Sequence, residues 1–157
     1  MQAGQTSLFL AMILLSAFMV ASFALLFYML RRLQKRQAAA VMKRFEGRRL
    51  LAISSSANFF GLSSRGLRQL RGNGILALTE DTLFFQLWLS RNCIEIPVKS
   101  ISGIATPRIF LRKSILRPLL RVDFTSDKGR PDAAAWYVKK LPEWKEALER
   151  LMAAKQV

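Results

Sequence analysis

The feature that most constrains this chain is an uncharged stretch near its start, residues 7–30. The run, SLFLAMILLSAFMVASFALLFYML, contains no charged residue, proline, glycine, asparagine or glutamine. A bilayer core about 30 Å thick needs about 20 helical residues, so the run is long enough to cross it. Because a single segment in hydrocarbon can satisfy its backbone hydrogen bonds only as a helix, we expect one transmembrane helix here, after a short tail of residues 1–6.

A cleaved signal peptide and a buried core helix are the alternatives for this run. A signal peptide has a basic start and an apolar core of about 7–15 residues. Residues 1–6 contain no Lys or Arg, and the apolar run is longer than such a core. A core helix usually keeps a polar face, which this run lacks. An uncleaved anchor is therefore the favoured interpretation.

Basic residues follow the run directly. Residues 2–6 carry no charge, whereas residues 31–44 contain basic residues and no acidic one. Because Lys and Arg stay on the cytoplasmic side, we expect a single-pass protein of the cell (inner) membrane with its N-terminus outside and its C-terminal domain in the cytoplasm. Residues 31–45 should form a basic juxtamembrane helix or linker that contacts anionic lipid or acts only as a topology signal. Its basic residues are Arg31, Arg32, Lys35, Arg36, Lys43 and Arg44.

The remaining residues, 46–157, have the length of one domain. The whole chain carries 25 Lys and Arg against 10 Asp and Glu, a net charge of +15, which suits anionic lipid or nucleic acid. It has no histidine and one cysteine, Cys93. These counts exclude an internal disulfide and a cysteine-rich zinc site, and they remove the commonest general base. We therefore expect no catalytic, metal-binding or cofactor-binding residues and no enzyme activity, with Cys93 buried in an apolar strand.

Alternating apolar residues predict a series of short strands after residue 50. We expect strands at 50–53, 75–79, 83–89, 93–98, 101–106, 119–125 and 133–139. Residues 54–61 should be an irregular stretch or a strand with a bend, and residues 72–74 a turn. The period then becomes helical, because Trp144, Leu148 and Leu151 form one apolar stripe, which predicts a helix at 142–154. The expected fold is a mainly-β partial barrel of six or seven antiparallel strands capped by a C-terminal α-helix.

Several short motifs follow one another in the order of a known domain type. GILALT at 74–79 precedes TLFF at 82–85, EIPV at 95–98, ISGI at 101–104, the strand at 119–124 and the helix with Trp144. With these motifs, residues 46–152 resemble a pleckstrin-homology (PH) domain, in particular a GRAM-like member from a bacterial membrane-anchored protein. The resemblance implies a PH-like partial barrel. It also implies a domain that binds phosphoinositides or proteins, or serves as a scaffold.

The candidate contact surface is the stretch 108–118, in which basic and apolar residues alternate without an acidic residue. If this stretch is a loop, its apolar side chains have no obvious core to enter. That pattern suits an anionic membrane interface or an acidic protein partner, and it also fits an ordinary hairpin packed on the barrel. The candidate residues are Arg108, Ile109, Phe110, Leu111, Arg112, Lys113, Ile115, Leu116 and Arg117.

A second basic cluster consists of Arg65, Arg68 and Arg71, spaced by three residues. Arginine pairs well with phosphate oxygens, so the cluster is a candidate phosphate contact, with solvated loop charges as the alternative. Nucleic-acid binding is not favoured, because aromatic residues such as Phe85 and Trp136 fall on predicted apolar faces instead of forming stacking platforms.

These observations predict a non-enzymatic, membrane-anchored binding or scaffold protein. Its basic PH-like domain would face the cytoplasmic leaflet and bind anionic lipid head groups or a partner protein. The alternative is a structural or accessory subunit of a larger membrane complex. In that case the transmembrane helix is part of the interface, since small residues at 16, 17, 21 and 24 favour helix packing in membranes.

Overall fold

The computed structural model describes the backbone of residues 2–88 and 93–154, and the side chains of residues 10–88 and 93–154. The chain divides into two compact units, Met1–Arg36 and Gln37–Val157. The first unit is helical, and the second contains a β-sheet and a C-terminal helix.

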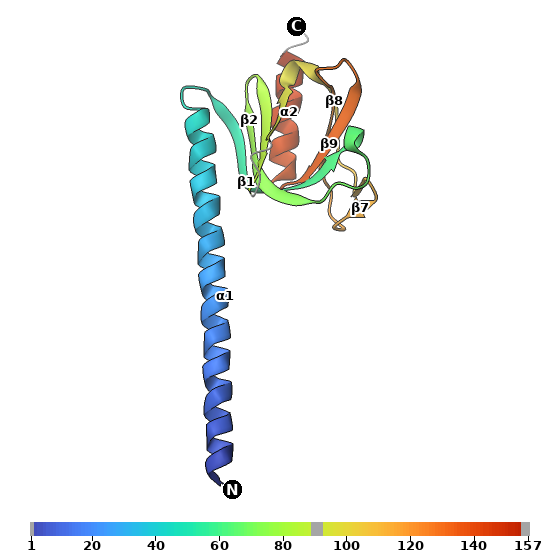
Figure 1. Cartoon of the computed structure of the whole chain (residues 1–157). Helices are drawn as coiled ribbons and strands as arrows, with labels where there is room; N and C mark the ends of the chain where they lie inside the picture. The colour runs from blue at the N-terminus through green and yellow to red at the C-terminus, as the bar shows by residue number, and fades with distance from the viewer. Residues whose placement is uncertain (1, 89–92, 155–157) are drawn as a thin grey trace. The chain divides into compact units, whose positions relative to one another are not determined.

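Helix α1 (Gln2–Arg44) contains the apolar run and continues through the basic segment, as expected (Figure 1). Residues 10–30 are exposed throughout, and the most apolar window of the helix has a mean hydropathy of 2.5. Among the described residues, it is the one helix long and apolar enough to cross a membrane. The helix ends before Gly47, whose φ of 83° lies in the left-handed region that favours glycine after a helix.

Seven antiparallel strands form the main sheet, in the order β4-β3-β2-β1-β9-β8-β5. The strands are β1 (Leu50–Leu62), β2 (Gly72–Thr79), β3 (Thr82–Leu87), β4 (Cys93–Pro97), β5 (Ile101–Ala105), β8 (Leu120–Thr125) and β9 (Pro131–Tyr137). A separate hairpin consists of β6 (Ile109–Phe110) and β7 (Lys113–Ser114). Two 3₁₀ turns, η1 (Ser63–Arg65) and η2 (Val98–Ser100), follow β1 and β4.

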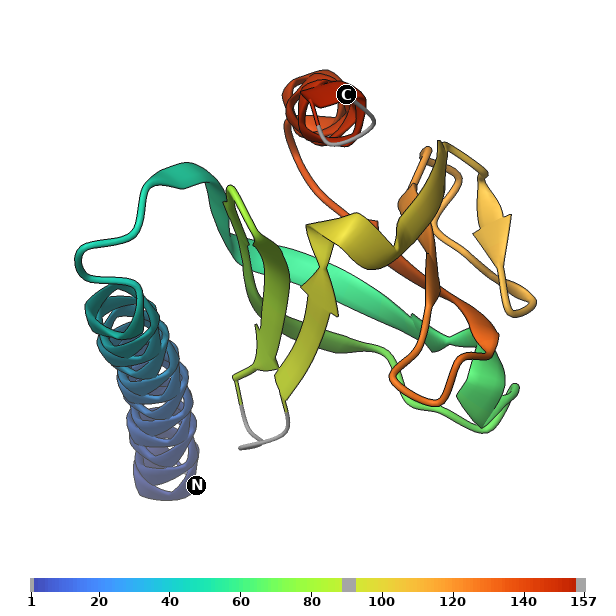
Figure 2. The ribbon, with the colours of Figure 1, turned by 90° about the horizontal axis from the view of Figure 1, so that it is seen from above.

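Helix α2 (Leu141–Ala154) packs against the inner side of the curved sheet (Figure 2). Its Trp144 and Leu148 are buried and its Leu151 is partly buried, which confirms the apolar stripe predicted for this helix. At the centre of the core, the rings of Phe59, Phe85 and Trp136 lie with centroids 5.1–5.9 Å apart. This strand order and capping helix confirm the expected PH-like fold.

The end of α1 and Phe45, which directly follows it, pack on β2 and β3. Val41 and Phe45 are buried there in a cluster with Ile75, Ala77 and Phe84. The rings of Phe45 and Phe84 meet edge to face at a centroid distance of 5.2 Å. Residues from Gln37 onward therefore belong to the same compact unit as the sheet. The domain start at residue 46 stays a prediction.

Of the two possibilities for residues 54–61, the structure shows the strand. They belong to the 13-residue strand β1, in which bulges accommodate the uneven pattern. The expected turn at residues 72–74 was wrong, because these residues are the start of β2, opposite Ala57, Asn58 and Phe59. The glycines are needed there because a Cβ at Gly72 would collide with Leu87, and one at Gly74 with the Gln86 carbonyl oxygen.

Cys93 was expected to be buried, but it is exposed. It begins β4, which is an edge strand bonded only to β3 on the described part of the chain. Residue 89, expected in the strand at 83–89, lies outside the described residues.

Candidate functional site

Residues 106–119, between β5 and β8, form the hairpin loop that carries the predicted contact residues (Figure 1). The Leu119 N–H donates to the Pro107 carbonyl at 2.8 Å and closes the base of the loop. The Ser114 hydroxyl donates to the Arg108 carbonyl at 2.8 Å and accepts from the Leu116 N–H at 3.0 Å. These hydrogen bonds give the loop a defined shape.

The backbone of this hairpin loop is strained at three positions. Leu111, Arg112 and Leu116 have φ angles of 50°, 59° and 60°. Residues other than glycine enter this left-handed region at a cost, so the surrounding contacts must hold them there.

The apolar residues of the hairpin loop divide into an inner and an outer set. Phe110 is 7% exposed and lies in a cluster with Phe60 and Leu119, while Leu111 and Ile115 pack against the same cluster. Phe60 belongs to β1. The cluster is separate from the main core, which consists of other side chains. Two candidate residues remain in solvent, Ile109 at 64% exposure and Leu116 at 90%.

The basic residues of the hairpin loop divide in the same way. The Lys113 ammonium donates to the carbonyl oxygens of Phe60, at 2.9 Å, and Gln69, at 2.5 Å. The Arg117 guanidinium donates to the Tyr137 hydroxyl at 3.0 Å. Arg108 and Arg112 are exposed and form no ion pair with any other described residue.

The second candidate cluster lies in the arginine loop, residues 63–71, between β1 and β2. Arg71 donates to Asn58 Oδ1 at 3.0 and 3.1 Å, and its guanidinium lies 4.4 Å from the centroid of the Phe60 ring. Arg65 lines a cleft, and Arg68 is exposed. Within the described ranges, neither Arg65 nor Arg68 forms an ion pair. The three arginines thus have different surroundings.

Sequence reasoning missed three residues of the arginine loop. The Gln69 side chain donates to the carbonyl oxygens of Leu62, at 2.6 Å, and Gly66, at 2.8 Å, and accepts from the Leu62 N–H at 2.9 Å. Leu67 and Leu70 are 51% and 90% exposed. The sequence did contain a pattern that could have identified the two leucines as contact residues. Residues 65–71, R-G-L-R-Q-L-R, mix basic and apolar residues as residues 108–117 do.

The juxtamembrane basic residues are all exposed. The Arg31 guanidinium lies 4.4 Å from the centroid of the Phe27 ring, in the unit that ends at Arg36. Arg44, in the second unit, forms an ion pair with Glu95. The four others, Arg32, Lys35, Arg36 and Lys43, form no ion pair within the described chain.

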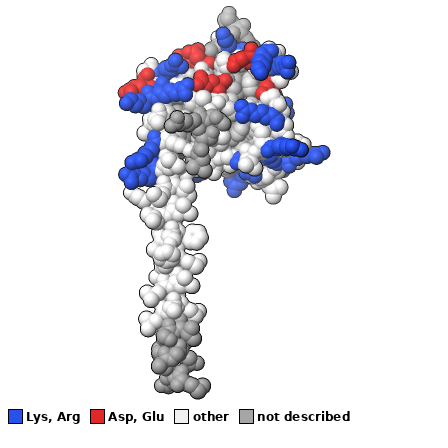
Figure 3. Space-filling model, in the orientation of Figure 1, with Lys and Arg blue, Asp and Glu red and all other residues white. Residues whose placement is uncertain are grey.

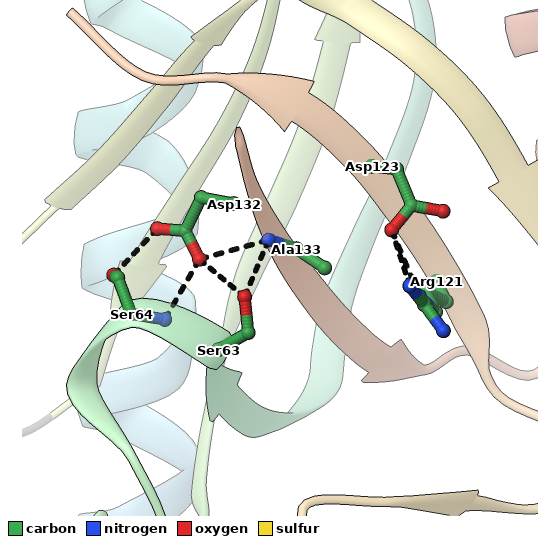
Figure 4. Close-up of polar contacts among 6 residues, drawn as sticks. All are labelled: Ser63, Ser64, Arg121, Asp123, Asp132 and Ala133. Atoms are coloured by element: carbon green, nitrogen blue, oxygen red, sulfur yellow. Dashed lines mark hydrogen bonds and ion pairs between the residues drawn. The ribbon is translucent and has the colours of Figure 1, made fainter. Parts of the chain in front are cut away.

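The Asp132 carboxylate of β9 accepts four hydrogen bonds, three of which come from η1 (Figure 4). Its carboxylate accepts from both Ser63 Oγ and Ser64 Oγ at 2.6 Å, and from the N–H groups of Ser64 at 2.9 Å and Ala133 at 2.8 Å. Partial burial raises the pKa of Asp132, but these hydrogen bonds outweigh that effect and place the pKa below its ordinary value. Figure 4 also shows the ion pair between Arg121 and Asp123 on β8, at 2.6 Å.

A cleft of about 530 Å³ lies between η1, β4 and the connection from β8 to β9. Its charged lining residues balance, with Arg65, Lys128 and Arg130 against Glu95, Asp127 and Asp132. The hairpin and arginine loops together carry only basic charges, so they attract an anion more strongly than this cleft does. No group of three or more His, Cys, Asp or Glu side chains in the described residues is placed to hold a metal ion.

The distribution of charge over the visible face of the domain agrees with the difference between the charge-balanced cleft and the basic loops (Figure 3). Acidic side chains gather towards the top of the domain in that view. The lower right, where Figure 1 labels β7, shows basic side chains among uncharged ones.

Two solved structures that match with TM-scores above 0.5 support the fold. The C-terminal domain of an unknown protein from Leishmania infantum matches with a TM-score of 0.53 and 14% sequence identity, over 73% of this chain and 97% of that one. A chain of the 8S snRNP assembly intermediate matches with a TM-score of 0.52 and 15% identity, over 66% of this chain and 82% of that one. The Vps36 N-terminal PH domain matches with a TM-score of 0.49 and 17% identity, over 71% and 83%.

At these identities, the likenesses concern the fold alone. No protein-family model matches the chain, and no curated protein matches its sequence.

Proposed function

We propose that this chain is a non-enzymatic, single-pass membrane protein whose basic PH-like domain binds anionic lipid head groups at the cytoplasmic leaflet. The exposed apolar helix supports the anchor, and the basic residues that follow the apolar run support the cytoplasmic orientation. The domain is tethered to the surface that it binds, so weak contacts suffice.

The observation that carries the proposal is the set of unpaired arginines on the two loops. Arg65, Arg68, Arg108 and Arg112 are exposed and form no ion pair within the described residues. Arginine binds phosphate oxygens in a bidentate manner, and a basic side chain near an anionic leaflet contributes about 1 kcal/mol. Lys113 is not part of this set, because its ammonium already binds two backbone carbonyls.

The proposal is tested on the full chain in nanodiscs, with Cys93→Ser and a donor fluorophore on Ala153→Cys in α2. Energy transfer to an acceptor in the bilayer measures how often the domain docks. We expect more transfer in phosphatidylcholine mixed with phosphatidylserine than in phosphatidylcholine alone. Arg108→Glu with Arg112→Glu should remove the difference.

The matched control is Lys99→Glu with Lys139→Glu, which changes the net charge equally at two exposed residues outside the loops. These substitutions should preserve most of the lipid dependence. Equal loss in both double variants would contradict a localised site, and no lipid dependence in the parent protein would refute the proposal.

An accessory subunit that uses its helix as an interface stays the alternative. Purification of the full chain in a mild detergent separates the two functions. A stoichiometric partner that is lost when Ala17 and Ala21 are replaced by leucine would favour the subunit.

A further inference from the structure

The hairpin loop and the arginine loop lie against each other, although 34 residues, 72–105, separate them in the sequence. Lys113 of the hairpin loop donates to the carbonyl of Gln69 in the arginine loop, and to that of Phe60 at the end of β1. A Cβ added at Gly61 would lie 2.8 Å from Leu111 Cδ1 and 3.1 Å from Gln69 Nε2. Leu111 and Gln69 therefore meet over Gly61, and the two loops form one surface.

The large apolar side chains of this double-loop surface (residues 63–71 and 106–119) are unusually exposed. Leu70 and Leu116 are each 90% exposed, Ile109 is 64% exposed and Leu67 is 51% exposed. Leu116 is held outward although its φ of 60° is unfavourable for leucine. Backbone strain of this kind persists where the surroundings impose it, and it often marks a functional segment.

The charges of the double-loop surface are all of one sign. It contains seven Lys and Arg and no Asp or Glu. An acidic groove of a protein could match the charge, but each exposed apolar residue of the two loops is next to an arginine in the sequence. Such interleaving fits a bilayer interface, where each apolar side chain enters the acyl boundary while the neighbouring cations stay at the head groups.

We propose that the double-loop surface is a membrane wedge that inserts Leu67, Leu70, Ile109 and Leu116 into an anionic bilayer. The wedge rests on the proposed function and specifies how the domain engages lipid, through apolar insertion in addition to charge. The bond from Lys113 to Gln69 keeps the two loops together, so that both enter the same leaflet. Because the insertion is apolar, part of the docking should persist at salt concentrations that screen the arginines.

The direct test places an environment-sensitive fluorophore at residue 116 or residue 70, through Leu116→Cys or Leu70→Cys in the full chain with Cys93→Ser. The protein is reconstituted in nanodiscs of phosphatidylcholine and phosphatidylserine that contain a lipid with a quencher high on its acyl chain. Both labels should be quenched, and the same label at Ala153→Cys should not be. Labels at 70 and 116 that are quenched no more than the label at 153 would overturn the wedge.

A second measurement uses the docking assay described above. Full burial of one leucine changes an equilibrium by roughly tenfold or more, so Leu70→Ser with Leu116→Ser should lower the docked-to-undocked ratio at least about tenfold. Both leucines are almost fully exposed, so the fold should not be affected. The matched control is Ile53→Ser, which removes a 43% exposed side chain of β1 and should leave docking unchanged.

The two proposals fail in different ways. If the serine variants dock like the parent while charge reversal still abolishes docking, the wedge is overturned and the anionic-lipid function stands. If the labels stay unquenched and lipid composition has no effect on docking, both proposals are refuted, and the surface would then suit a protein partner.

Discussion

At the scale of single residues, Asp132 illustrates how one carboxylate can hold two segments together. Ser63 and Ser64 directly follow β1, and Asp132 is the second residue of β9. Its carboxylate accepts hydrogen bonds from both serines. The folded state thus favours the ionised form, which keeps the pKa of Asp132 below its ordinary value.

The pKa of Asp132 predicts a pH dependence of stability. In the unfolded chain an aspartate has a pKa of about 3.9. Because the folded pKa is lower, the stabilisation is fully present above pH ~4 and is lost as the pH falls through the folded pKa. Asp132→Asn should lower the melting temperature at neutral pH by about 4 °C, and its difference from the parent should shrink below pH ~4.

This effect is measured by thermal unfolding of the full chain in detergent, followed by tryptophan fluorescence. Asp127→Asn is the control, because Asp127 is exposed. A difference between Asp132→Asn and the parent that stays constant down to the acid transition would contradict the role assigned to this carboxylate.

Also at the residue scale, the sequence located the basic residues of the hairpin loop but not their roles. Ile109 and Phe110 are adjacent in a two-residue strand, and nothing in so short a pattern says which one enters the cluster with Phe60. Lys113 was predicted to contact a membrane or a partner, but its ammonium binds two backbone carbonyls of residues distant in the sequence. Such contacts depend on tertiary structure and leave no local periodicity.

At the scale of elements, regular periodicity was the reliable signal. In β3, the alternating residues Leu83 and Phe85 lie in the main core, whereas Phe84 lies in the cluster with Val41 and Phe45. The helical stripe of α2 was equally clear. The expectations that failed concern positions where neighbours override local preference. The bulges of β1 arise where it pairs with its neighbouring strands, and residues of β3 leave no room for a side chain at Gly72 or Gly74. A single segment of sequence does not encode such contacts between strands.

The end of α1 should behave as part of the folded domain. Phe45 is 5% exposed and packs on Phe84, so Phe45→Ala should lower the free energy of unfolding of the unit Gln37–Val157 by about 3 kcal/mol. Denaturant unfolding of the full chain in detergent, followed by tryptophan fluorescence, measures the change. Met42→Ala, at a 54% exposed position on the same turn of helix, should cost less than about 0.5 kcal/mol. Equal effects of the two substitutions would show that this turn does not contribute to the domain.

At the scale of the whole molecule, an apolar helix precedes a domain with a strongly basic surface. The net charge of +15 is concentrated in part on the juxtamembrane segment and the double-loop surface, which together contain 13 of the 25 Lys and Arg. A tethered domain of this charge gains most where the adjacent leaflet is anionic. The proposed function therefore depends on the orientation across the membrane, since the other leaflet would offer this surface little.

The single cysteine of the chain permits a direct measurement of that orientation. Cys93 is exposed at the start of β4 and is accessible to a membrane-impermeant maleimide. We predict that Cys93 of the chain in the membrane fraction is labelled only after the cells are permeabilised. With Cys93→Ser and Gln5→Cys, the N-terminal cysteine should be labelled in intact cells. Labelling of Cys93 in intact cells, to the same extent as after permeabilisation, would contradict the account.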